Sequence, residues 1–418
     1  MRPATPLRQT KPHIPPKRNP LKKKTDLPIA MSSPDLSDSE RQAVAGVLDT
    51  PSLSMGPQIQ AFEKAFTDFT GLGHAVGVNS GTSGLHLCVR AAGVSAGDLV
   101  LTTPFSFVAS TNVMLFENAI PVFVDVDPGS GNLNPALLKE AGRDLVAGGE
   151  RTKGWLPRKG AEQRKALKAI LAVDVFGQPA DWDPINKVAS ELGVKVIEDS
   201  CEALGAEYKH RKVGTLGDYG VFAFYPNKQI TTGEGGMVVT DDAPAAELMR
   251  ALRNQGRAPG DTWLSHTHLG YNYRLDEMSA ALGAAQMRRL ELLLQKREQV
   301  AAWYGERLAE IPGVEAPGVE ATTTRMSWFV YVVRFDPAID RDALAKRLEM
   351  QGVPVRPYFL PIHLQPYMVE RFGYREGDFP VTEDLGRRGL ALPFSGVMTE
   401  EQVESVCRSI HSELAKGK

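Results

Sequence analysis

The stretch Phe222-Ala-Phe-Tyr-Pro-Asn-Lys-Gln-Ile-Thr-Thr-Gly-Glu-Gly-Gly236 joins two apolar runs through a turn that contains one lysine. The run Gly220–Phe224 predicts a strand that stops near Pro226, and Gly236–Thr240 predicts a second strand. Lys228 lies between them, next to a strand end, where α/β proteins form their sites. A lysine amine that attacks an aldehyde has to lose its proton, and desolvation lowers the pKa of a lysine amine. A solvated loop lysine explains this stretch equally well.

The same alternation of strand and helix extends to both sides of this stretch. Short apolar runs are followed by Gly or Pro and then by amphipathic patterns with the spacing of a helix. This order predicts an α/β fold with a mainly parallel sheet that helices cover on both faces, and ligands bind at the carboxyl ends of such strands. The further strand candidates are Ala75–Val78, Asp98–Thr102, Pro121–Val126, Ala169–Val175 and Val194–Glu198.

Carboxylates follow one of these strands in the stretch Val196-Ile-Glu-Asp-Ser-Cys-Glu202. Asp199 precedes Lys228 by about one strand–helix unit, a spacing that suits one shared site. An acid that faces a pyridine nitrogen keeps the ring protonated, as an enzyme that uses pyridoxal phosphate (PLP) requires. A strand-end aspartate that caps a helix is the alternative, and this stretch by itself favours that alternative.

Small residues mark a candidate anion site in the stretch Val78-Asn-Ser-Gly-Thr-Ser-Gly84. Backbone N–H groups at a helix start bind phosphate together with hydroxyls such as those of Thr82 and Ser83. The stretch lacks the lysine of a P-loop and the glycine spacing of a dinucleotide site, so neither class of nucleotide is favoured. A capped helix without a ligand is the alternative. Phe107, after another strand, offers a ring for stacking on a planar cofactor, or for ordinary core packing.

The sequence changes character near residue 278. A helical pattern extends over residues 278–308, and strands such as Trp328–Phe335 follow it. Thr399 and Gln402 cap a last helix. The apolar face of this helix consists of Val403, Val406 and Ile410. We therefore predict a large α/β domain over residues 28–277 and a smaller α+β domain over residues 278–418. A capping box in Ser37-Asp-Ser-Glu40 predicts the first helix of the large domain.

Residues 1–27 form a third, different segment. Met1–Asp26 contains eight Lys/Arg and one acid, with frequent prolines and few large apolar residues. Such a composition does not support a folded core, so we predict a disordered basic extension, or an upstream start codon ahead of Met31. The segment has no apolar core of a secretory signal. A basic arm that contacts an anionic partner is the alternative interpretation.

Composition excludes several classes of partner. Lys+Arg is 48 and Asp+Glu is 50 in 418 residues, so the charge balance gives no reason to expect nucleic acid as the main partner. No apolar stretch approaches the roughly 20 residues of a membrane helix. The three cysteines form no CxxC pair, which argues against a disulfide framework and fits a cytoplasmic protein. We predict no metal site.

Several motifs in one order make the chain similar to the sugar aminotransferase family named DegT/DnrJ/EryC1/StrS. The resemblance extends from about Pro28 to the end of the chain. It implies PLP-dependent enzymes of fold type I, mostly acting on nucleotide-linked keto-sugars. The motifs that carry it are NSGTSGLHL, TTPFSFVAST, PVFVDVDPGSGNL, VFGQPADWDPI, VIEDSCEALGAEY, YPNKQITTGEGG, LGYNYRLDEMSAALG, VRPYFLPIHLQPY and LALPF.

The resemblance also implies roles for single residues. Lys228 is expected to form the Schiff base with PLP and to carry protons, and Asp199 to pair with the pyridinium nitrogen. The expected cofactor contacts are Thr82 and Ser83 on the phosphate, Phe107 stacked on the ring, and Asn272 on the phosphate of the neighbouring subunit's cofactor, which requires a homodimer with shared sites. Arg274 is expected to bind the donor carboxylate, and Arg356 and His363 are weaker candidates for the sugar nucleotide, with a structural role as the alternative.

Two positions depart from the family pattern. Glu202 replaces the Gln or His that many members have near the 3′ oxygen of the cofactor; glutamate also occurs there in members that resemble perosamine synthases. A carboxylate beside that phenolate oxygen needs its own proton or a neighbouring donor. Ala223 replaces a serine that commonly binds the phosphate. Lys228 itself argues against a related dehydratase branch that has histidine in its place.

The expected reaction moves an amino group in two half-reactions from an amino acid, with L-glutamate as the expected donor, to a nucleotide-linked keto-sugar such as an NDP-4-dehydro-6-deoxyhexose. Such an amino sugar serves polysaccharide or glycoconjugate biosynthesis. One alternative is a PLP-dependent lyase or dehydratase on the same fold. The other is an inactive regulatory homologue, which only the basic extension supports and which the Lys228–Asp199 pair argues against.

Overall fold

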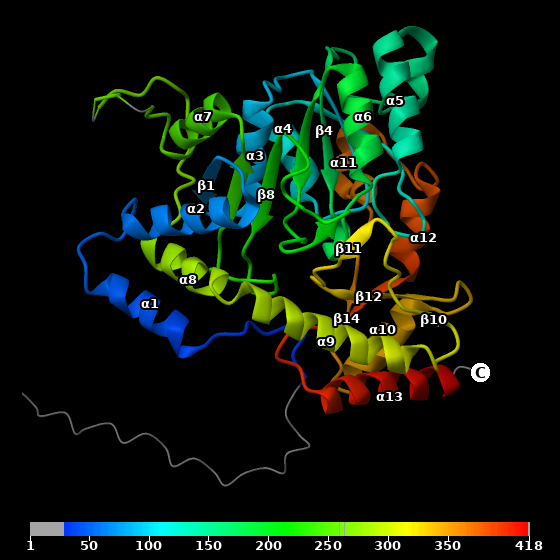
Figure 1. The fold of residues 1–418 in the computed structure, drawn as a ribbon. Helices are drawn as coiled ribbons and strands as arrows, with labels where there is room; N and C mark the ends of the chain where they lie inside the picture. The colour runs from blue at the N-terminus through cyan, green and yellow to red at the C-terminus, as the bar shows by residue number, and fades with distance from the viewer. Residues whose placement is uncertain (1–28, 259, 263, 417–418) are drawn as a thin grey trace, which may run out of the picture.

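The structure, a computed structural model, describes residues 29–258, 260–262 and 264–416 and is built on a seven-stranded sheet (Figure 1). All its strands run parallel except β9, which is antiparallel to both of its neighbours. The seven predicted strands and the mainly parallel α/β fold are confirmed. In spatial order the strands are β1 (His74–Val78), β9 (Gly236–Thr240), β8 (Tyr219–Ala223), β5 (Lys195–Asp199), β4 (Leu167–Val173), β2 (Leu99–Thr102) and β3 (Ile120–Phe123).

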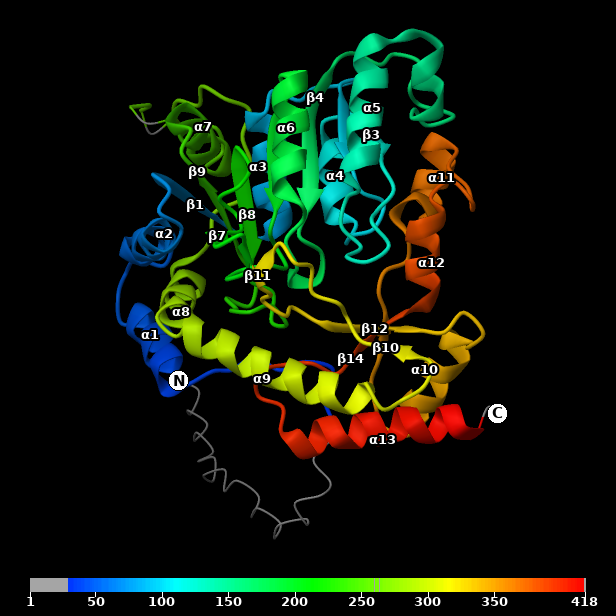
Figure 2. The same ribbon diagram turned by 45° about the vertical axis from the view of Figure 1, so that its right-hand side comes forward.

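Helices cover both faces of this sheet (Figure 2). Alternate side chains of a strand enter different cores. Val238 packs with the helices of the first face, whereas Val239 packs with α2 (Pro57–Thr70) and α8 (Glu277–Met287) on the second face. Farther along that second face lie α5 (Pro135–Ala147) and α6 (Trp182–Leu192). The helices of the first face are α3 (Gly81–Ala91), α4 (Ala109–Phe116) and α7 (Ala243–Arg253).

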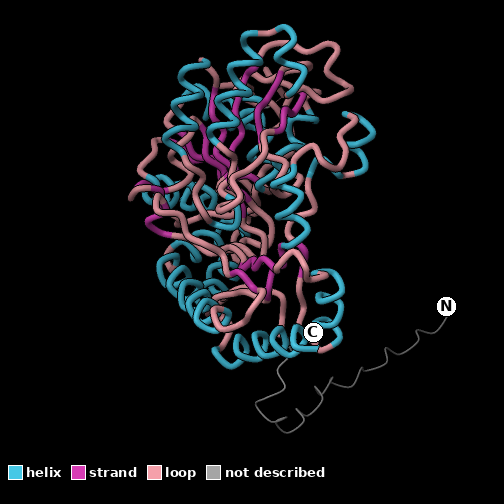
Figure 3. Tube along the Cα trace, turned by 90° about the vertical axis from the view of Figure 1, so that its right-hand side faces the viewer, coloured by secondary structure: helices cyan, strands magenta, loops and turns pink. Residues whose placement is uncertain are grey.

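A second core lies beneath the large sheet (Figure 3). It packs a four-stranded sheet against helices, with Tyr304, Val333, Leu344 and Val406 fully buried. The sheet order is β10 (Val314–Glu315), β12 (Tyr331–Phe335), β14 (Gly389–Leu392) and β13 (Arg356–Pro357). The helices are α9 (Leu290–Leu308), α10 (Arg341–Met350) and α13 (Glu400–Lys416), and α11 (Pro366–Phe372) and α12 (Pro380–Arg388) extend toward the large sheet. The exact domain boundary at residue 278 stays a prediction.

Three local predictions were wrong. The helix predicted over residues 278–308 is two helices, because the backbone at Arg289 departs from helical geometry, with φ −108° and ψ 5°. The Arg289 side chain binds Asp35 and Glu40 at this break. Strand β12 begins at Tyr331, because Trp328 has a left-handed φ of 52°. The connection from β5 to β8 contains no helix; the short strands β6 (Glu207–Tyr208) and β7 (Arg211–Lys212) pair there, and β6 also pairs with β11 (Thr323–Arg325).

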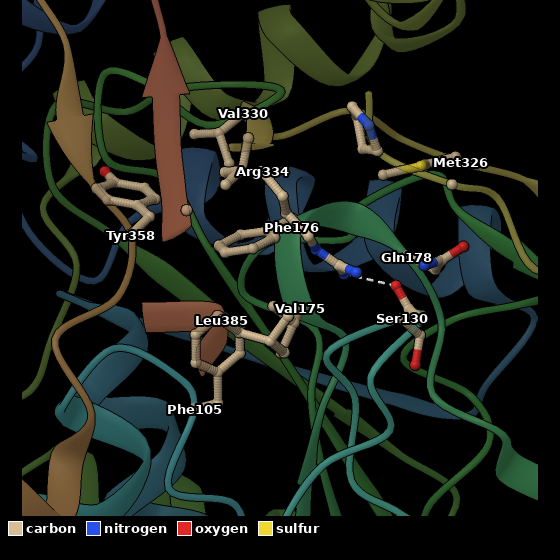
Figure 4. Close-up of a pocket in the computed structure, with 15 residues that line it drawn as sticks. Phe105, Ser130, Val175, Phe176, Gln178, Met326, Val330, Arg334, Tyr358 and Leu385 are labelled. Atoms are coloured by element: carbon tan, nitrogen blue, oxygen red, sulfur yellow. Dashed lines mark hydrogen bonds between the residues drawn. The ribbon is translucent and has the colours of Figure 1, made fainter. Parts of the chain in front are cut away.

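The two cores meet along a seam of aromatic and polar contacts (Figure 4). Arg334 of β12 donates hydrogen bonds to the carbonyls of Pro128 and Gly129, both at 2.6 Å. Phe176, which follows β4, lies against Phe359 with ring centroids 5.1 Å apart. Phe176 therefore forms part of the contact between the two cores.

The amino-terminal segment fastens both cores to the start of α9. The carbonyl of Met31 accepts a hydrogen bond from the amide of Phe394, while Glu40 of α1 (Asp38–Leu48) is buried against Arg289 and Gln286. The capping box of Ser37 and Glu40 is confirmed, as is the reciprocal cap of α13 by Thr399 and Gln402. The predicted basic extension of residues 1–27 lies outside the described residues. No described helix has both the length and the apolar character for crossing a membrane.

Glu40 gives a test of this attachment. Burial raises the pKa of its carboxyl, but hydrogen bonds from Ser37, Arg289 and Gln286 outweigh burial and lower the pKa to about 2. Because this value lies below the ordinary 4.5, the ionised form stabilises the fold above pH 4.5, and its contribution disappears as the pH falls to about 2. We expect Glu40→Gln to lower the free energy of unfolding by about 2 kcal/mol at pH 7 in urea titrations.

The difference between Glu40→Gln and the unmodified protein should narrow steadily below pH 4.5. Glu298→Gln is the matched control, because Glu298 also pairs with an arginine, Arg325, but at the surface. We expect that change to cost about 0.5 kcal/mol or less. An equal loss of unfolding free energy in Glu40→Gln and Glu298→Gln would contradict the role of buried Glu40 in attaching the amino-terminal segment.

Candidate active site

A cavity of about 470 Å³ opens at the carboxyl ends of β2, β5 and β8. This is the edge at which the sequence predicted a site, and five of the predicted residues line it: Thr82, Phe107, Asp199, Glu202 and Lys228. The remaining wall residues include Ser80, Gly81, Ser106, Ser110, Cys201, Ala223, Tyr225, Asn227, Glu234, Phe329, Tyr358 and Phe359.

Lys228 points its amine toward a carboxylate and an aromatic ring. Its Nζ lies 3.6 Å from Glu202 Oε1 and 3.6 Å from the centroid of the Phe329 ring. The other oxygen of Glu202 accepts the backbone N–H of Phe176 at 2.9 Å. Burial raises the pKa of Glu202, and the charge of Lys228 opposes that rise. Where many family members have Gln or His, this chain therefore has a carboxylate beside Lys228. Its other oxygen binds Phe176, which is part of the seam.

Asp199 is buried and ends strand β5. Its Oδ2 accepts a hydrogen bond from Ser110 at 2.8 Å, and its Oδ1 accepts the amide of Cys201 at 3.2 Å. Ser110 in turn shares a hydrogen bond of 2.9 Å with Ser106. These donors fix the direction of the carboxylate. Neither serine was predicted from the sequence, although two serines four residues apart after a strand end were the available signal.

The amino terminus of α3 forms one end of the cavity. Helix α3 begins at Gly81 with Ser80 as its cap, and Ser80, Gly81 and Thr82 line the wall. A Cβ atom at Gly81 would lie 2.7 Å from the Cβ of Ala223, so only glycine fits this approach. Ser83 is turned away: its hydroxyl donates to Asn79 at 2.6 Å. Its predicted contact with a phosphate therefore stays a prediction, and Ser80 takes its place on the wall.

Aromatic rings form the remaining walls. Phe107 is 63% exposed, which is unusual for a phenylalanine at a strand end and leaves its ring open to the cavity. Phe329, Tyr358 and Phe359 approach from the segments next to strands β12 and β13 of the four-stranded sheet. Sequence reasoning missed these three rings, because only the packing of the second core brings them to the large sheet.

Asn272 and Arg274 do not line the cavity of their own chain. Arg274 donates to Asn254 at 3.0 Å, and the carbonyl of Asn272 accepts from the side chain of Asn79 at 3.3 Å. A buried network holds this loop from α3: His86 contacts Glu117 and the hydroxyl of Tyr273, at 2.8 and 3.0 Å, and Arg90 donates to Tyr271 at 2.9 Å. Burial lowers the pKa of His86, and Glu117 opposes this.

Arg356 and His363 are also outside the cavity. Arg356 is exposed and pairs with Glu349 at 2.9 Å. His363 is fully buried, with its Nε2 2.9 Å from Glu383 and its ring edge against Phe379. Both environments are structural, which matches the alternative that the sequence left open. Their predicted contact with a sugar nucleotide stays a prediction without support from this placement.

The cavity fits a planar, phosphate-bearing aldehyde. The amino terminus of α3, with the hydroxyls of Ser80 and Thr82, suits a phosphate. The buried carboxylate of Asp199 suits a protonated ring nitrogen, and Lys228 supplies an amine for an aldehyde. The exposed ring of Phe107 offers a stacking surface. On a mainly parallel α/β fold, these features define a PLP-dependent enzyme.

The chain belongs to the DegT/DnrJ/EryC1/StrS aminotransferase family, whose sequence model matches residues 34–411. It is therefore a PLP-dependent aminotransferase, as the sequence motifs predicted. It is 37% identical to the GDP-perosamine synthase of Caulobacter vibrioides over 395 residues, which cover 93% of this chain and 100% of that protein.

Solved structures agree with this assignment. PseC of Helicobacter pylori, an aminotransferase involved in pseudoaminic acid biosynthesis, superimposes with a TM-score of 0.83 at 27% identity, over 93% of this chain and 100% of that one. DesI, solved in the presence of its TDP-sugar product, superimposes with a TM-score of 0.80 at 30% identity, over 94% of each chain.

The raised pKa of Glu202 predicts a pH-dependent effect on stability. A carboxyl whose pKa is higher in the folded state contributes most to stability at low pH, and this contribution is lost as the pH rises above 4.5 and through the raised value. Glu202→Gln cannot ionise. We therefore expect the melting temperature of this variant, relative to that of the unmodified cofactor-free protein, to increase as the pH rises. At pH 8 the variant should melt at least about 2 °C above the unmodified protein.

Thermal unfolding of the cofactor-free protein between pH 4.5 and pH 8 measures this difference. Glu207→Gln, on the neighbouring strand β6 and outside the cavity, serves as the control and should show no trend. A difference for Glu202→Gln that stays constant or declines toward pH 8 would contradict the assigned direction.

Proposed function

We propose that this chain transfers an amino group from L-glutamate to a nucleotide-linked keto-sugar, an NDP-4-dehydro-6-deoxyhexose, and works as a homodimer with shared active sites in the cytoplasm. The product would serve polysaccharide or glycoconjugate biosynthesis. The observation that carries the proposal is the convergence of Lys228, Asp199 and the start of α3 on one cavity. The full-length similarity to a protein named GDP-perosamine synthase supports the class of acceptor.

The proposed roles follow from the chemistry of each residue. PLP supplies an electron sink when bound, and Asp199 keeps its ring nitrogen protonated. The backbone N–H groups at Gly81 and Thr82 hold the phosphate. Lys228 would hold the cofactor through its Nζ, and the same amine, when free, would carry the proton that leaves or reaches the substrate carbon in each half-reaction.

Exposed apolar side chains support the proposed dimer. Leu264 and Leu269 are 85% and 83% exposed in the loop between α7 and α8, which extends away from the body of the protein (Figure 1). Phe116 and Tyr225 are also exposed. A second copy that covers such side chains removes apolar area from water. Asn272 follows this loop, so the same contact would carry its side chain toward a neighbouring cavity.

Two variants test the catalytic assignment. We expect Lys228→Ala to lower the transfer of ¹⁵N from glutamate to a keto-sugar nucleotide by about 1000-fold or more, because it removes the proton carrier. We expect Asp199→Asn to lower it by about 100-fold, because a neutral amide no longer pairs with the protonated ring. Borohydride should fix the cofactor to residue 228 of the unmodified protein.

Lys209→Ala is the matched control, since Lys209 pairs with Asp183 at the surface. Its transfer rate should remain within about twofold of the unmodified rate. Full ¹⁵N transfer by Lys228→Ala would refute the assignment. Release of keto acid or water without labelled amino sugar would instead point to the lyase or dehydratase alternative, and a protein that never reacts with glutamate would point to the regulatory one.

Mixed dimers test the shared site. We expect Lys228→Ala and Asn272→Ala to be inactive or weak alone but to regain about a quarter of the unmodified activity after equimolar mixing and subunit exchange. A hybrid dimer contains one site in which both residues are intact only if Asn272 acts across the interface. If Asn272 serves its own chain, neither site of the hybrid is complete and mixing restores nothing; sedimentation confirms that exchange took place.

A further inference from the structure

The guanidinium of Arg297 holds the backbone behind Lys228. Arg297 lies in α9 and is 4% exposed. Its Nη2 donates to the carbonyls of Asn227 and Lys228, at 3.0 and 2.6 Å. Its Nη1 donates to the carbonyls of Trp328 and Phe329, at 3.1 and 3.2 Å. One side chain therefore joins two segments that are about a hundred residues apart in sequence and meet at the cavity.

Burial of the Arg297 guanidinium between these two segments costs desolvation free energy. Burial lowers its pKa to about 10, and among the residues that the structure describes no carboxylate forms an ion pair with it. A buried charge without a counter-ion is tolerated only where its hydrogen-bonding groups are used, here by four carbonyl oxygens. A neutral side chain of similar length would avoid the cost of desolvation, so stability alone does not account for a charged group at this position.

Both joined segments determine where the amine of Lys228 lies. The first segment carries the lysine itself. The second carries Phe329, whose ring centroid lies 3.6 Å from Lys228 Nζ. Trp328, which precedes it, has a left-handed φ of 52°, a conformation that a residue with a Cβ adopts only where its surroundings hold it. Arg297 thus fixes both the origin of the lysine side chain and the ring against which its end lies.

We propose that Arg297 is a positioning residue that sets the direction of the Lys228 amine in the cavity. The inference rests on the proposed function of Lys228 as the cofactor-binding amine. In the condensation with PLP the neutral amine forms a carbon–nitrogen bond to the aldehyde carbon and one water leaves. Misplacement of the reacting atom by about 1 Å lowers the rate of such a step by up to about 100-fold. Arg297 contributes by geometry and does not touch the reacting atoms.

Capture of PLP by the cofactor-free protein measures this geometry without any turnover. The variants are Arg297→Met, which removes all four hydrogen bonds, and Arg297→Lys, which keeps the charge and part of the donors. Arg334→Met is the matched control, because Arg334 also bridges the two cores through two backbone carbonyls but lies outside the cavity. The rate is followed by visible absorbance, with borohydride trapping and peptide mass spectrometry at Lys228.

We expect Arg297→Met to capture PLP at least about tenfold more slowly than Arg334→Met, with Arg297→Lys between them, even where all three variants lose similar thermal stability. Equal capture rates for Arg297→Met and Arg334→Met would overturn the proposal. If Arg297→Met does not fold, the comparison of Arg297→Lys with Arg334→Met decides, and equal rates again overturn it. An unmodified protein that is never labelled at Lys228 would instead refute the proposed function.

Discussion

The parallel register of β5 against its neighbours is the constraint on which the cavity depends. Val173 of β4 and Val221 of β8 lie opposite Asp199, so the carboxyl ends of these strands stop at one edge. Side chains alternate between the faces of a strand. Asp199 therefore faces the cavity, while the carboxylate of Glu198 accepts amides of Gly214, Leu216 and Gly217 on the other side. A slip by one residue would turn Asp199 to the opposite face of the sheet and remove its carboxylate from the cavity.

Much of this arrangement could be predicted because its determinants are local. Each strand of the large sheet is a short apolar run, and Lys228, Asp199 and Thr82 directly follow such runs. The missed features are set by distant parts of the chain. Nothing in the sequence around Arg289 interrupts a helix; the break lies where the Arg289 side chain binds Asp35 and Glu40, which are distant in sequence. Phe329 and Tyr358 likewise reach the cavity only through the packing of the second core.

Burial of the charged groups around Lys228 costs folding free energy, while the same groups serve the chemistry of the site. Glu202 is buried with a raised pKa, and Arg297 is buried without an ion-pair partner. Both are nevertheless satisfied by backbone groups: Glu202 accepts the amide of Phe176, and Arg297 donates to four carbonyls. Buried polar groups that are fully hydrogen-bonded restrict the local structure to one arrangement, which is what a site with closely spaced acids and an amine needs.

Helix α9 belongs to two parts of the molecule at once. Arg289 directly precedes its first turn and binds the amino-terminal segment, and Arg297 near its start binds the lysine loop. Val300, Tyr304 and Leu308 farther along the helix are part of the second core. Because α9 is one continuous helix and Arg297 binds the lysine loop, a rotation of the second core would turn the lysine loop as well. The width of the cavity mouth and the direction of the Lys228 amine would then change together.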